Sequence, residues 1–357
     1  MLNFRDTYFS FTTELTKMLA AGSRHENVIF SPFSVIMLLA TLADGTAGET
    51  REEILNIISA GREAPVFLKA LKALQNDLTQ DGTVTSANAV VVRNDLAGTI
   101  REGYERHLAA CADGKLFASD DMVRAVNAWV QEKTRGMISE AADDSMKDML
   151  LCMLNAVSFE ALWRRQYEDD DIREEVFHNS DGTACWVQML HSNEYDYIEN
   201  DEFTGFSKHY KDTPFSYVAL LPRDSRRPLD EMIPDFRQIL QQRRKEEVAV
   251  GMPEFKASYT AELTQICQAL GIKTVFTPQA DFSPVSSFPL MADAIIHKAR
   301  IEVDRQGTKA AAASMAVMVT GAFRVDIKEV ILDRPFLYVI VHEGTGLPLF
   351  VGLVNQL

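Results

Sequence analysis

Apolar residues in the first part of the chain recur at the spacing of helices. On a helix of 3.6 residues per turn, a single side carries Tyr8, Phe11, Leu15 and Met18. A short apolar run ends at Pro32, and because proline is favoured at the first position of a helix, a strongly apolar helix is expected to begin there. The first of these helices is predicted at residues 4–21. The same spacing predicts further helices at residues 46–58, 65–78 and 122–138, and strands are predicted at 27–30 and 86–92.

From Leu150 onward the pattern changes to that of strands. The run L-C-M-L-N-A-V-S-F is almost continuously apolar, as a strand covered on both faces of its sheet requires. Asn155 is the polar residue inside this run, and a buried Asn must find hydrogen-bond partners. The pattern predicts an α+β chain, with strands at 177–190, 195–197, 206–210, 215–221, 248–255, 295–303, 330–332 and in two C-terminal runs, and helices at 234–245 and 261–270.

The predicted strand at 295–303 alternates cleanly between two faces. One face carries His297, Ala299, Ile301 and Val303. Because successive side chains of a strand point to opposite faces, this mostly apolar face is expected to be buried, and His297 with it. No serine, cysteine or acid near His297 in sequence suggests a catalytic partner, so a hydrogen-bonded core histidine is favoured over a catalytic base.

The next segment, from Gly307 to Gly321, carries two conflicting signals. It reads G-T-K-A-A-A-A-S-M-A-V-M-V-T-G. Its alanines and Lys309 favour a helix with Thr308 as N-cap, whereas its second half is richer in β-branched residues. If the segment is a strand, side chains alternate between two faces, and those on one face are mostly small and uncharged. The segment contains no proline, so every backbone N–H could join the hydrogen bonds of a sheet. The segment is therefore either a surface helix or a strand able to enter a sheet.

Composition and charge narrow the class of protein. The chain has 357 residues without a Pro/Gly/Ser-rich linker or a repeat, which favours a single domain over residues 1–357. A net charge of −15, without a large basic cluster, argues against nucleic acid or an anionic membrane as a partner. No apolar run is long enough to span a membrane. The N-terminus lacks the apolar core of a signal peptide, so the protein is expected to be cytoplasmic, or extracellular if a signal peptide has been removed.

Motifs of known catalytic and metal sites are missing from the sequence. The cysteines are far apart and form no C-x-x-C pattern, so buried free thiols are expected at Cys111, Cys152, Cys185 and Cys267. The sequence contains no G-x-S-x-G, H-E-x-x-H or Walker A pattern, and its seven histidines form no i, i+4 pair. The sequence therefore predicts neither an enzyme nor a metal site or other bound cofactor.

Five stretches, in order along the chain, carry the pattern of one protein family. V-I-F-S-P-F-S-V, V-N-A-W-V-Q-E-K-T-R-G-M-I and L-N-A-V-S-F-E-A-L-W resemble the N-F-S-P-x-S motif, a helix motif and the strand with a buried Asn of the serpins. H-K-A-R-I-E-V-D-R-Q-G-T-K-A-A-A-A-S resembles the strand and hinge before their reactive-centre loop. L-D-R-P-F-L-Y-V-I-V-H-E-G-T-G-L-P-L-F-V-G resembles their C-terminal signature. The resemblance spans essentially the whole chain.

The resemblance implies three β-sheets, about eight to nine helices and an exposed reactive-centre loop. It also implies a suicide-type inhibitor, which traps a serine protease in a covalent complex while the cleaved loop inserts into the main sheet. By this resemblance the hinge of the loop consists of Gly307, Thr308, Lys309, Ala310, Ala311, Ala312, Ala313 and Ser314. The polar cluster beneath the opening sheet consists of Ser31, Ser34, Asn155 and His297, and insertion begins at Trp163.

The position of the scissile bond depends on how the loop is counted. Counting forward from the hinge with the family's spacing gives the bond Gly321-Ala322, which predicts elastase-like or subtilisin-like targets because small residues fit shallow pockets. Counting back from the C-terminal signature instead gives the bond after Arg324 and trypsin-like targets, whereas Phe323 would suit chymotrypsin-like proteases. The forward count is favoured because the inserted length sets how far the protease is moved.

Arg305 departs from the family pattern, since a Glu is usual there at the base of the loop, and the usual charge pairing is in question. The helix at 65–78 has no basic face, so no heparin-type cofactor is expected.

The protein is thus predicted to be a monomeric inhibitor of serine proteases. The alternative is a non-inhibitory carrier or chaperone of the same fold. Its hinge would be expected to contain charged or bulky residues or proline, which residues 308–314 lack apart from Lys309.

Overall fold

The computed structural model describes residues 2–61, 63–79, 82–112, 114–134, 136, 142–147, 149–308 and 327–357. These residues form two compact units. Unit 1 comprises Met1–Phe11, Phe30–Ser158 and Tyr259–Arg300, and unit 2 comprises Thr12–Ile29, Phe159–Ser258 and Ile301–Leu357. The boundaries fall inside elements such as α1 (Leu2–Ala20) and β12 (Ala294–Val303), so no linker separates the two units in the sequence.

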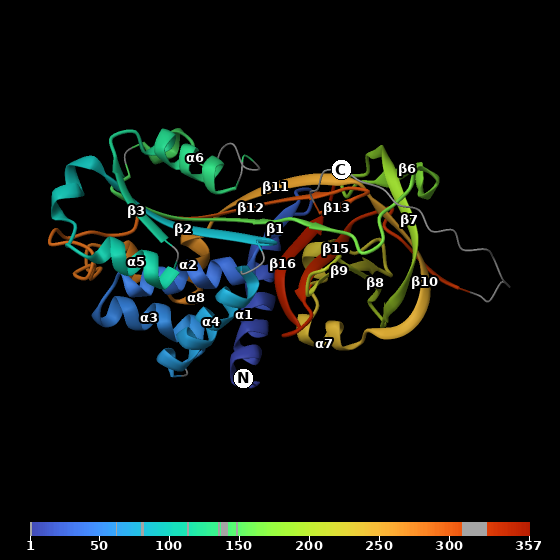
Figure 1. The fold of residues 1–357 in the computed structure, drawn as a ribbon, viewed down its shortest axis with the longest axis horizontal. Coiled ribbons are helices and arrows are strands. Elements are labelled where there is room, and N and C mark those ends of the chain that lie inside the picture. The colour runs from blue at the N-terminus through green and yellow to red at the C-terminus, as the bar shows by residue number, and fades with distance from the viewer. Residues whose placement is uncertain are drawn as a thin grey trace. The chain divides into compact units, whose positions relative to one another are not determined.

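Unit 1 is a sheet with helices on both faces. Its strands follow the order β3 (Gly114–Ser119), β2 (Val84–Arg93), β4 (Leu151–Phe159), β12. Figure 1 shows α6 on one face of this sheet and α2, α3 and α4 on the other. The helices of unit 1 are α2 (Pro32–Asp44), α3 (Gly48–Ser59), α4 (Ala64–Thr79), α5 (Tyr104–Ala112), α6 (Met122–Lys133) and α8 (Thr264–Leu270).

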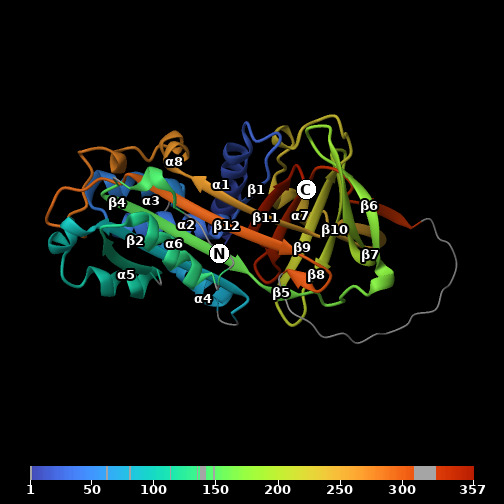
Figure 2. The same cartoon turned by 90° about the horizontal axis from the view of Figure 1, so that it is seen from above.

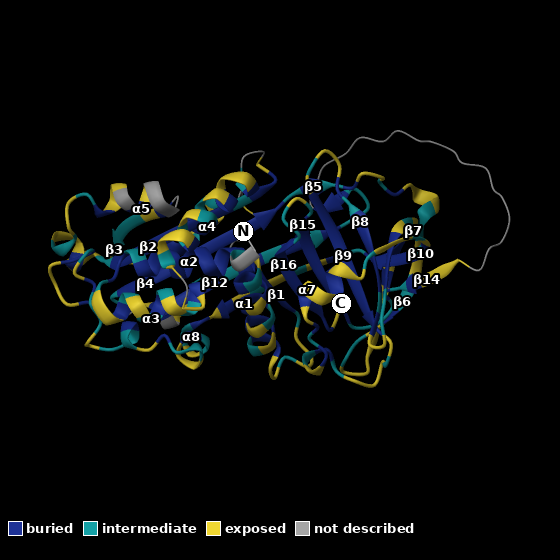
Figure 3. Cartoon of the chain, turned by 90° about the horizontal axis from the view of Figure 1, so that it is seen from below, coloured by how far each residue is buried: buried dark blue, intermediate teal, exposed yellow. Residues whose placement is uncertain are grey.

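The strands β4 and β12 are direct neighbours in unit 1. They pair in parallel from Cys152↔Ala294 to Val157↔Ala299, and they lie side by side in Figure 2. One face of this pair packs under α6, where Trp129 contacts a cluster of small and aliphatic side chains. All nine residues of β4 are buried, as the apolar run predicted, and β4 is dark blue in Figure 3. The opposite face therefore points toward α2.

Unit 2 consists mainly of antiparallel strands. One path runs β1 (Val28–Phe30), β16 (Leu347–Val354), β15 (Phe336–His342), β9 (Phe215–Pro222), β8 (Phe203–His209) and β7 (Ala184–Glu199). From β7 the path continues to β10 (Arg244–Pro253) and then to β14 (Lys328–Ile331). The strand β6 (Ile172–His178) lies off this path and pairs with β7. Since β7 pairs with β6 and β10 along most of its length and with β8 at its end, two sheets share this strand. With the sheet of β4 and β12 this makes three sheets.

Shorter elements complete the chain. Two short strands, β5 (Ala161–Leu162) and β13 (Gly307–Thr308), lie at the base of the loop. The remaining elements are α7 (Phe236–Gln241), β11 (Phe255–Glu262) and the 3-10 turns Asn94–Thr99, Asp144–Met146, Asp169–Asp171, Leu229–Glu231 and Thr274–Phe276. The two C-terminal strands that the sequence predicted are β15 and β16, and they pair with each other in antiparallel fashion.

Several predicted elements were wrong in part. The helix predicted at 261–270 begins only at Thr264, because β11 continues to Glu262. The strand predicted at 177–190 is interrupted by a turn between β6 and β7, where Asp181 accepts a hydrogen bond from the backbone of Thr183 and Gly182 has a φ of +86°. The helix predicted at 234–245 ends at Gln241, because Arg244 already pairs with Tyr197 of β7. The helix α5 and the strand β3 were not predicted at all.

Two of the three described cysteines are the buried free thiols that the sequence predicted. Cys152 and Cys267 are buried free thiols, and Cys185 is a half-buried free thiol. Burial raises the pKa of both Cys152 and Cys267 to about 12, so neither is a reactive thiolate. The side chain of Cys111 lies outside the described residues. Within the described ranges, no helix is long and apolar enough to cross a membrane.

Candidate functional site

Two groups of side chains contain the positions singled out in the sequence, together with residues that the sequence analysis did not identify. The polar cluster, Ser31, Ser34, Ser86, Asn88, Asn155 and His297, lies in unit 1. The hinge clamp, Trp163, Tyr167, Tyr210 and the segment Asp304–Thr308, lies in unit 2. Each group joins side chains that are more than 90 residues apart in sequence.

His297 is the centre of the polar cluster. It is fully buried, as the alternation of its strand predicted. Its Nε2 accepts a hydrogen bond from the backbone N–H of Ser31 at 3.1 Å, and its Nδ1 lies 3.0 Å from Oδ1 of Asn155. Because Nε2 faces a donor, the ring proton is on Nδ1, which donates to Asn155. The ring is therefore held neutral in one tautomer.

Asn155 continues the network through two residues that the sequence analysis did not identify. Its Nδ2 donates to Oδ1 of Asn88 at 3.0 Å and reaches Oγ of Ser86 at 3.4 Å. The Ser34 hydroxyl lies 3.4 Å from the same Ser86 oxygen. The Ser31 side chain accepts from the Ser34 backbone as the N-cap of α2. The network thus ties β4 and β12 to β2 and to the start of α2.

Acid is expected to weaken the polar cluster. Burial lowers the pKa of His297 to about 3, whereas a histidine in the unfolded chain titrates near 6.5. The native state therefore binds fewer protons than the unfolded state between these values, so the contribution of His297 is complete above about pH 6.5 and is lost as the pH falls toward 3. Between about pH 6 and pH 4 the free energy of unfolding should fall by roughly 1.4 kcal/mol per pH unit from this residue.

Urea unfolding of the wild type and of His297→Gln, measured between pH 7 and pH 5, checks this expectation. Most carboxylates stay ionised in that window, so the difference between the two proteins isolates the histidine. The variant should be less stable at pH 7 and less sensitive to pH. Identical slopes in the two proteins would show that His297 does not titrate as described.

The first two residues of the hinge already form a strand. Thr308 pairs with Val303 of β12 on one side, and Gly307 pairs with Leu162 of β5 on the other. A Cβ atom at Gly307 would lie 2.1 Å from the carbonyl oxygen of Ala161, so only glycine fits at this rung. The Thr308 side chain is buried, and its hydroxyl lies 2.7 Å from the Tyr210 hydroxyl.

Trp163 fixes the turn that precedes this rung. Its ring stacks on Tyr210 at 4.5 Å between centroids, with an angle of 12° between planes. Its Nε1 donates to the carbonyl of Asp304 at 2.9 Å, and its backbone N–H donates to the carbonyl of Gln306 at 2.8 Å. The Asp304 carboxylate accepts from the backbone N–H groups of Gln306 and Gly307. Hydrogen bonds from Trp163 therefore fix the turn at residues 304–307 at Asp304 and at Gln306, and the Asp304 carboxylate fixes the turn from within.

Arg305 lies at the base of the loop with two acidic partners. Its guanidinium is 2.9 Å from the Asp169 carboxylate and 3.5 Å from the Glu254 carboxylate. Its backbone N–H also donates to Glu254 at 2.9 Å. An ion pair is therefore formed at this position, but its positive charge is on the loop side, where the family usually has the negative charge of a Glu. Because the guanidinium is 41% exposed, the pair contributes little to stability and acts mainly on local geometry.

The rest of the predicted loop lies outside the described residues. This applies to the hinge positions Lys309, Ala310, Ala311, Ala312, Ala313 and Ser314 and to the bond candidates Gly321, Ala322, Phe323 and Arg324. The described chain resumes at Ile327, and β14 then pairs in parallel with β10 from Val248↔Lys328. The two described ends of the loop are therefore anchored in different sheets.

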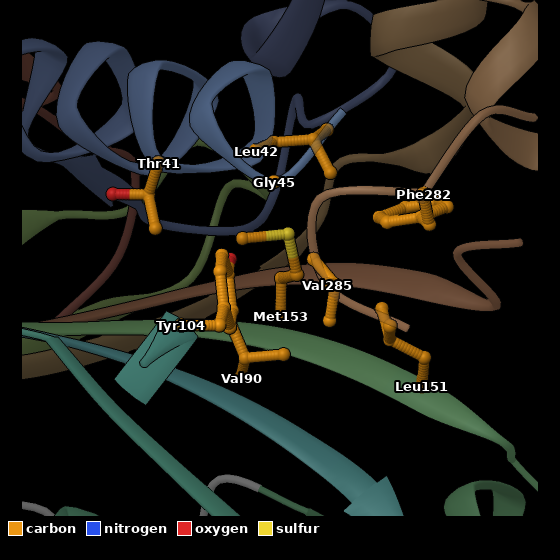
Figure 4. A pocket seen from close by; sticks show the side chains of 9 residues that line it. All are labelled: Thr41, Leu42, Gly45, Val90, Tyr104, Leu151, Met153, Phe282 and Val285. Atoms are coloured by element: carbon orange, nitrogen blue, oxygen red, sulfur yellow. The ribbon is translucent and has the colours of Figure 1, made fainter. Parts of the chain in front are cut away.

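A small void between side chains in unit 1 is not a binding site. Residues of α2, β2, α5 and β4 surround it, as Figure 4 shows. It has no room for a water molecule, so it is a packing gap rather than a binding pocket. Among the described residues, no group of three or more His, Cys, Asp or Glu side chains is placed to hold a metal ion.

Comparisons with known proteins agree with this geometry. The family model described as serpin (serine protease inhibitor) matches residues 6–357. The chain is 30% identical over 369 residues to plasminogen activator inhibitor 1 of Bos taurus, which covers 97% of this chain and 90% of the relative. It is 29% identical over 360 residues to an uncharacterized serpin-like protein of Thermococcus kodakarensis, which covers 96% of this chain and 83% of the relative.

A solved structure extends the agreement to the fold. The crystal structure of a thermophilic serpin, tengpin, in the native state superposes with a TM-score of 0.87 at 27% identity, over 98% of this chain and 93% of that chain. The architecture described above is thus the α+β serpin fold. Since the family match also covers nearly the whole chain, the protein belongs to the serpin family, a family of protease inhibitors rather than enzymes.

Proposed function

We propose that this serpin is a monomeric, suicide-type inhibitor of serine proteases. The serine of the protease attacks the carbonyl carbon before the scissile bond, the C–N bond breaks, and the amine leaves with a proton. The first part of the loop remains bound to the protease as an ester. Insertion of this part into the sheet then moves and distorts the protease before water hydrolyses the ester.

The strand β13 is the observation that carries this proposal. Gly307 and Thr308 already occupy two rungs between β5 and β12, so the rest of the loop needs only to continue an existing ladder. In unit 1 the strands β4 and β12 pair directly with each other, so they must separate before a strand can enter between them. The uncharged face of the loop sequence, rich in alanine, suits such an entry because it requires little space.

The register of β13 predicts which loop residue reaches the polar cluster. Thr308 pairs with Val303 in antiparallel fashion, so each further loop residue pairs with one residue earlier in β12. Ser314 lies six residues after Thr308, and His297 lies six residues before Val303. The same count on the β5 side leads to Asn155. Because Asn155 and His297 are direct partners, both counts predict that Ser314 would lie between them after insertion.

Ser314 can replace the hydrogen bond that insertion breaks. Separation of β4 and β12 would leave Nδ1–H of His297 and Oδ1 of Asn155 without each other. A hydroxyl between them accepts from the first and donates to the second, so no buried polar group is left unpaired. The match between the Ser314 hydroxyl and these two polar groups supports a loop that inserts between β4 and β12, and therefore an inhibitory serpin rather than a non-inhibitory one.

The length of the loop supports the same mechanism. About thirteen residues from Thr308, at about 3.4 Å each, make a strand of roughly 44 Å, enough to carry a tethered protease far from its first contact. This length corresponds to cleavage at Gly321-Ala322 and to elastase-like or subtilisin-like targets. Cleavage after Phe323 or Arg324 would correspond to chymotrypsin-like or trypsin-like targets instead.

Incubation with a panel of elastase-like, subtilisin-like, chymotrypsin-like and trypsin-like proteases tests the proposal. We expect a complex that survives denaturing electrophoresis with at least one elastase-like or subtilisin-like enzyme. The mass of the released C-terminal fragment identifies the scissile bond. A protease whose catalytic serine is replaced by alanine is the control, since it binds the loop but cannot form the ester. Cleavage without a complex across the whole panel would instead favour the carrier or chaperone alternative.

A further inference from the structure

A lysine is buried beneath the hinge clamp. Lys208 lies on β8, and only 2% of its side chain is exposed. Its Nζ donates a hydrogen bond to Oε1 of Glu194 on β7 at 2.7 Å. Because replacing a buried ion pair with neutral residues of similar size is often neutral for stability, stability alone does not account for this pair.

Two aromatic rings of the hinge clamp complete the surroundings of the ammonium group. Nζ lies 4.4 Å from the centroid of the Tyr167 ring and 5.6 Å from that of the Trp163 ring. Both distances are within the range of cation–π attraction, which is strongest for a cation removed from water. The Tyr167 hydroxyl lies 3.3 Å from Oγ of Ser192, which in turn donates to Glu194 at 2.8 Å. Cation, carboxylate and rings therefore form one connected network.

Lys208 keeps its charge in this network. Burial by itself lowers the pKa of Lys208, but the nearby Tyr167 and Glu194 outweigh burial and leave the pKa above its ordinary value. The attraction between the ammonium group and the rings is therefore present throughout the neutral pH range.

The residues that carry these rings also contact the base of the loop, Tyr167 through its backbone and Trp163 through its ring. The backbone N–H of Tyr167 donates to the carbonyl of Arg305 at 3.0 Å. Trp163 donates to Asp304 and stacks on Tyr210, whose hydroxyl contacts Thr308. A displacement of either ring would therefore shift the first rungs of the strand that the proposed mechanism extends.

We propose that Lys208 is a positioning residue for loop insertion. Its ammonium group, anchored by Glu194, fixes the rings of Trp163 and Tyr167. These rings hold the two rungs of β13 in register, so that insertion starts at once when the loop is cut. This role rests on the proposed inhibitory function, because it concerns the insertion step of that mechanism.

Lys208→Met tests the inference, because methionine keeps the length of the side chain and removes the charge. The first measurement is the ratio of cleaved free serpin to covalent complex, which should rise about tenfold with the loss of the two cation–π contacts. The second is the fluorescence emission of Trp163, recorded in a Trp129→Phe, Trp186→Phe background. Its maximum should shift when the cation beside the ring is removed.

The double variant Lys208→Met, Glu194→Gln separates positioning from stability. It removes both charges, so its unfolding midpoint should stay near that of the wild type while its ratio of cleaved to complexed protein stays high. Lys245→Met is the matched control. Lys245 is also paired with a carboxylate, Asp196 at 2.8 Å, but its side chain is 80% exposed, and neither readout should change.

Two results would overturn the inference. One is a double variant that traps protease as well as the wild type does. The other is a Trp163 emission that is the same with and without Lys208. If the wild type itself forms no complex, the proposed function is wrong, and the emission of Trp163 still decides whether Lys208 positions the clamp.

Discussion

Replacing Thr308 with arginine is expected to convert the protein from an inhibitor into a substrate of its target protease. Thr308 is buried between β5 and β12, and its hydroxyl contacts Tyr210 at 2.7 Å. An arginine at this rung must either bury a cation, which costs several kcal/mol, or leave the rung. A barrier raised by about 3 kcal/mol slows insertion roughly 100-fold, so hydrolysis of the ester overtakes it.

Denaturing electrophoresis of mixtures with the target protease measures this effect as the fraction of serpin that is cleaved rather than trapped. Two matched variants accompany Thr308→Arg. Thr308→Val keeps the shape and loses only the contact with Tyr210, so it should reduce trapping slightly. Ile327→Arg introduces the same charge at the other described end of the loop, where the side chain is 42% exposed, and should trap normally. If Thr308→Arg also traps normally, the rung of β13 is not the start of insertion.

Part of the polar cluster could be predicted from the sequence. The alternation at 295–303 indicated that His297 points inward, and the structure confirms this. The apolar run around Asn155 indicated a buried amide that needs partners, and three partners are present. Ser31, which the resemblance placed in this cluster, is the N-cap of α2 and also donates to His297 through its backbone N–H.

Other parts of the site depend on pairings that no local pattern reveals. Ser86 and Asn88 alternate within a weakly patterned strand, and this Ser-x-Asn spacing was the available signal for their role. Lys208 and Glu194 read as ordinary surface charges in the sequence. Only the antiparallel pairing of β7 with β8 brings them together beneath Trp163. The hydrophobic pattern identifies which face of a strand is buried, but it does not identify which strand lies opposite.

The hinge illustrates the same limit. Within Gly307–Gly321, helix and strand signals conflicted, and local propensity could not decide between them. Gly307 and Thr308 form a strand because β5 and β12 offer ladder partners on both sides. At Thr308, the alternative role as a helix N-cap is therefore overridden by these tertiary contacts.

The measurement that tests the central claim most directly compares unfolding of the intact serpin with that of the serpin cut within its loop. Insertion adds about a dozen ladder hydrogen bonds at about 0.5–1.5 kcal/mol each, so the cut protein should be more stable by roughly 6–18 kcal/mol. Guanidinium unfolding after cleavage by a protease that is not trapped would show a transition at a much higher denaturant concentration. Thr308→Arg, cut in the same way, is the matched control and should gain much less. A cut wild type that unfolds at the same concentration as the intact protein would contradict insertion, and with it the account of the hinge given above.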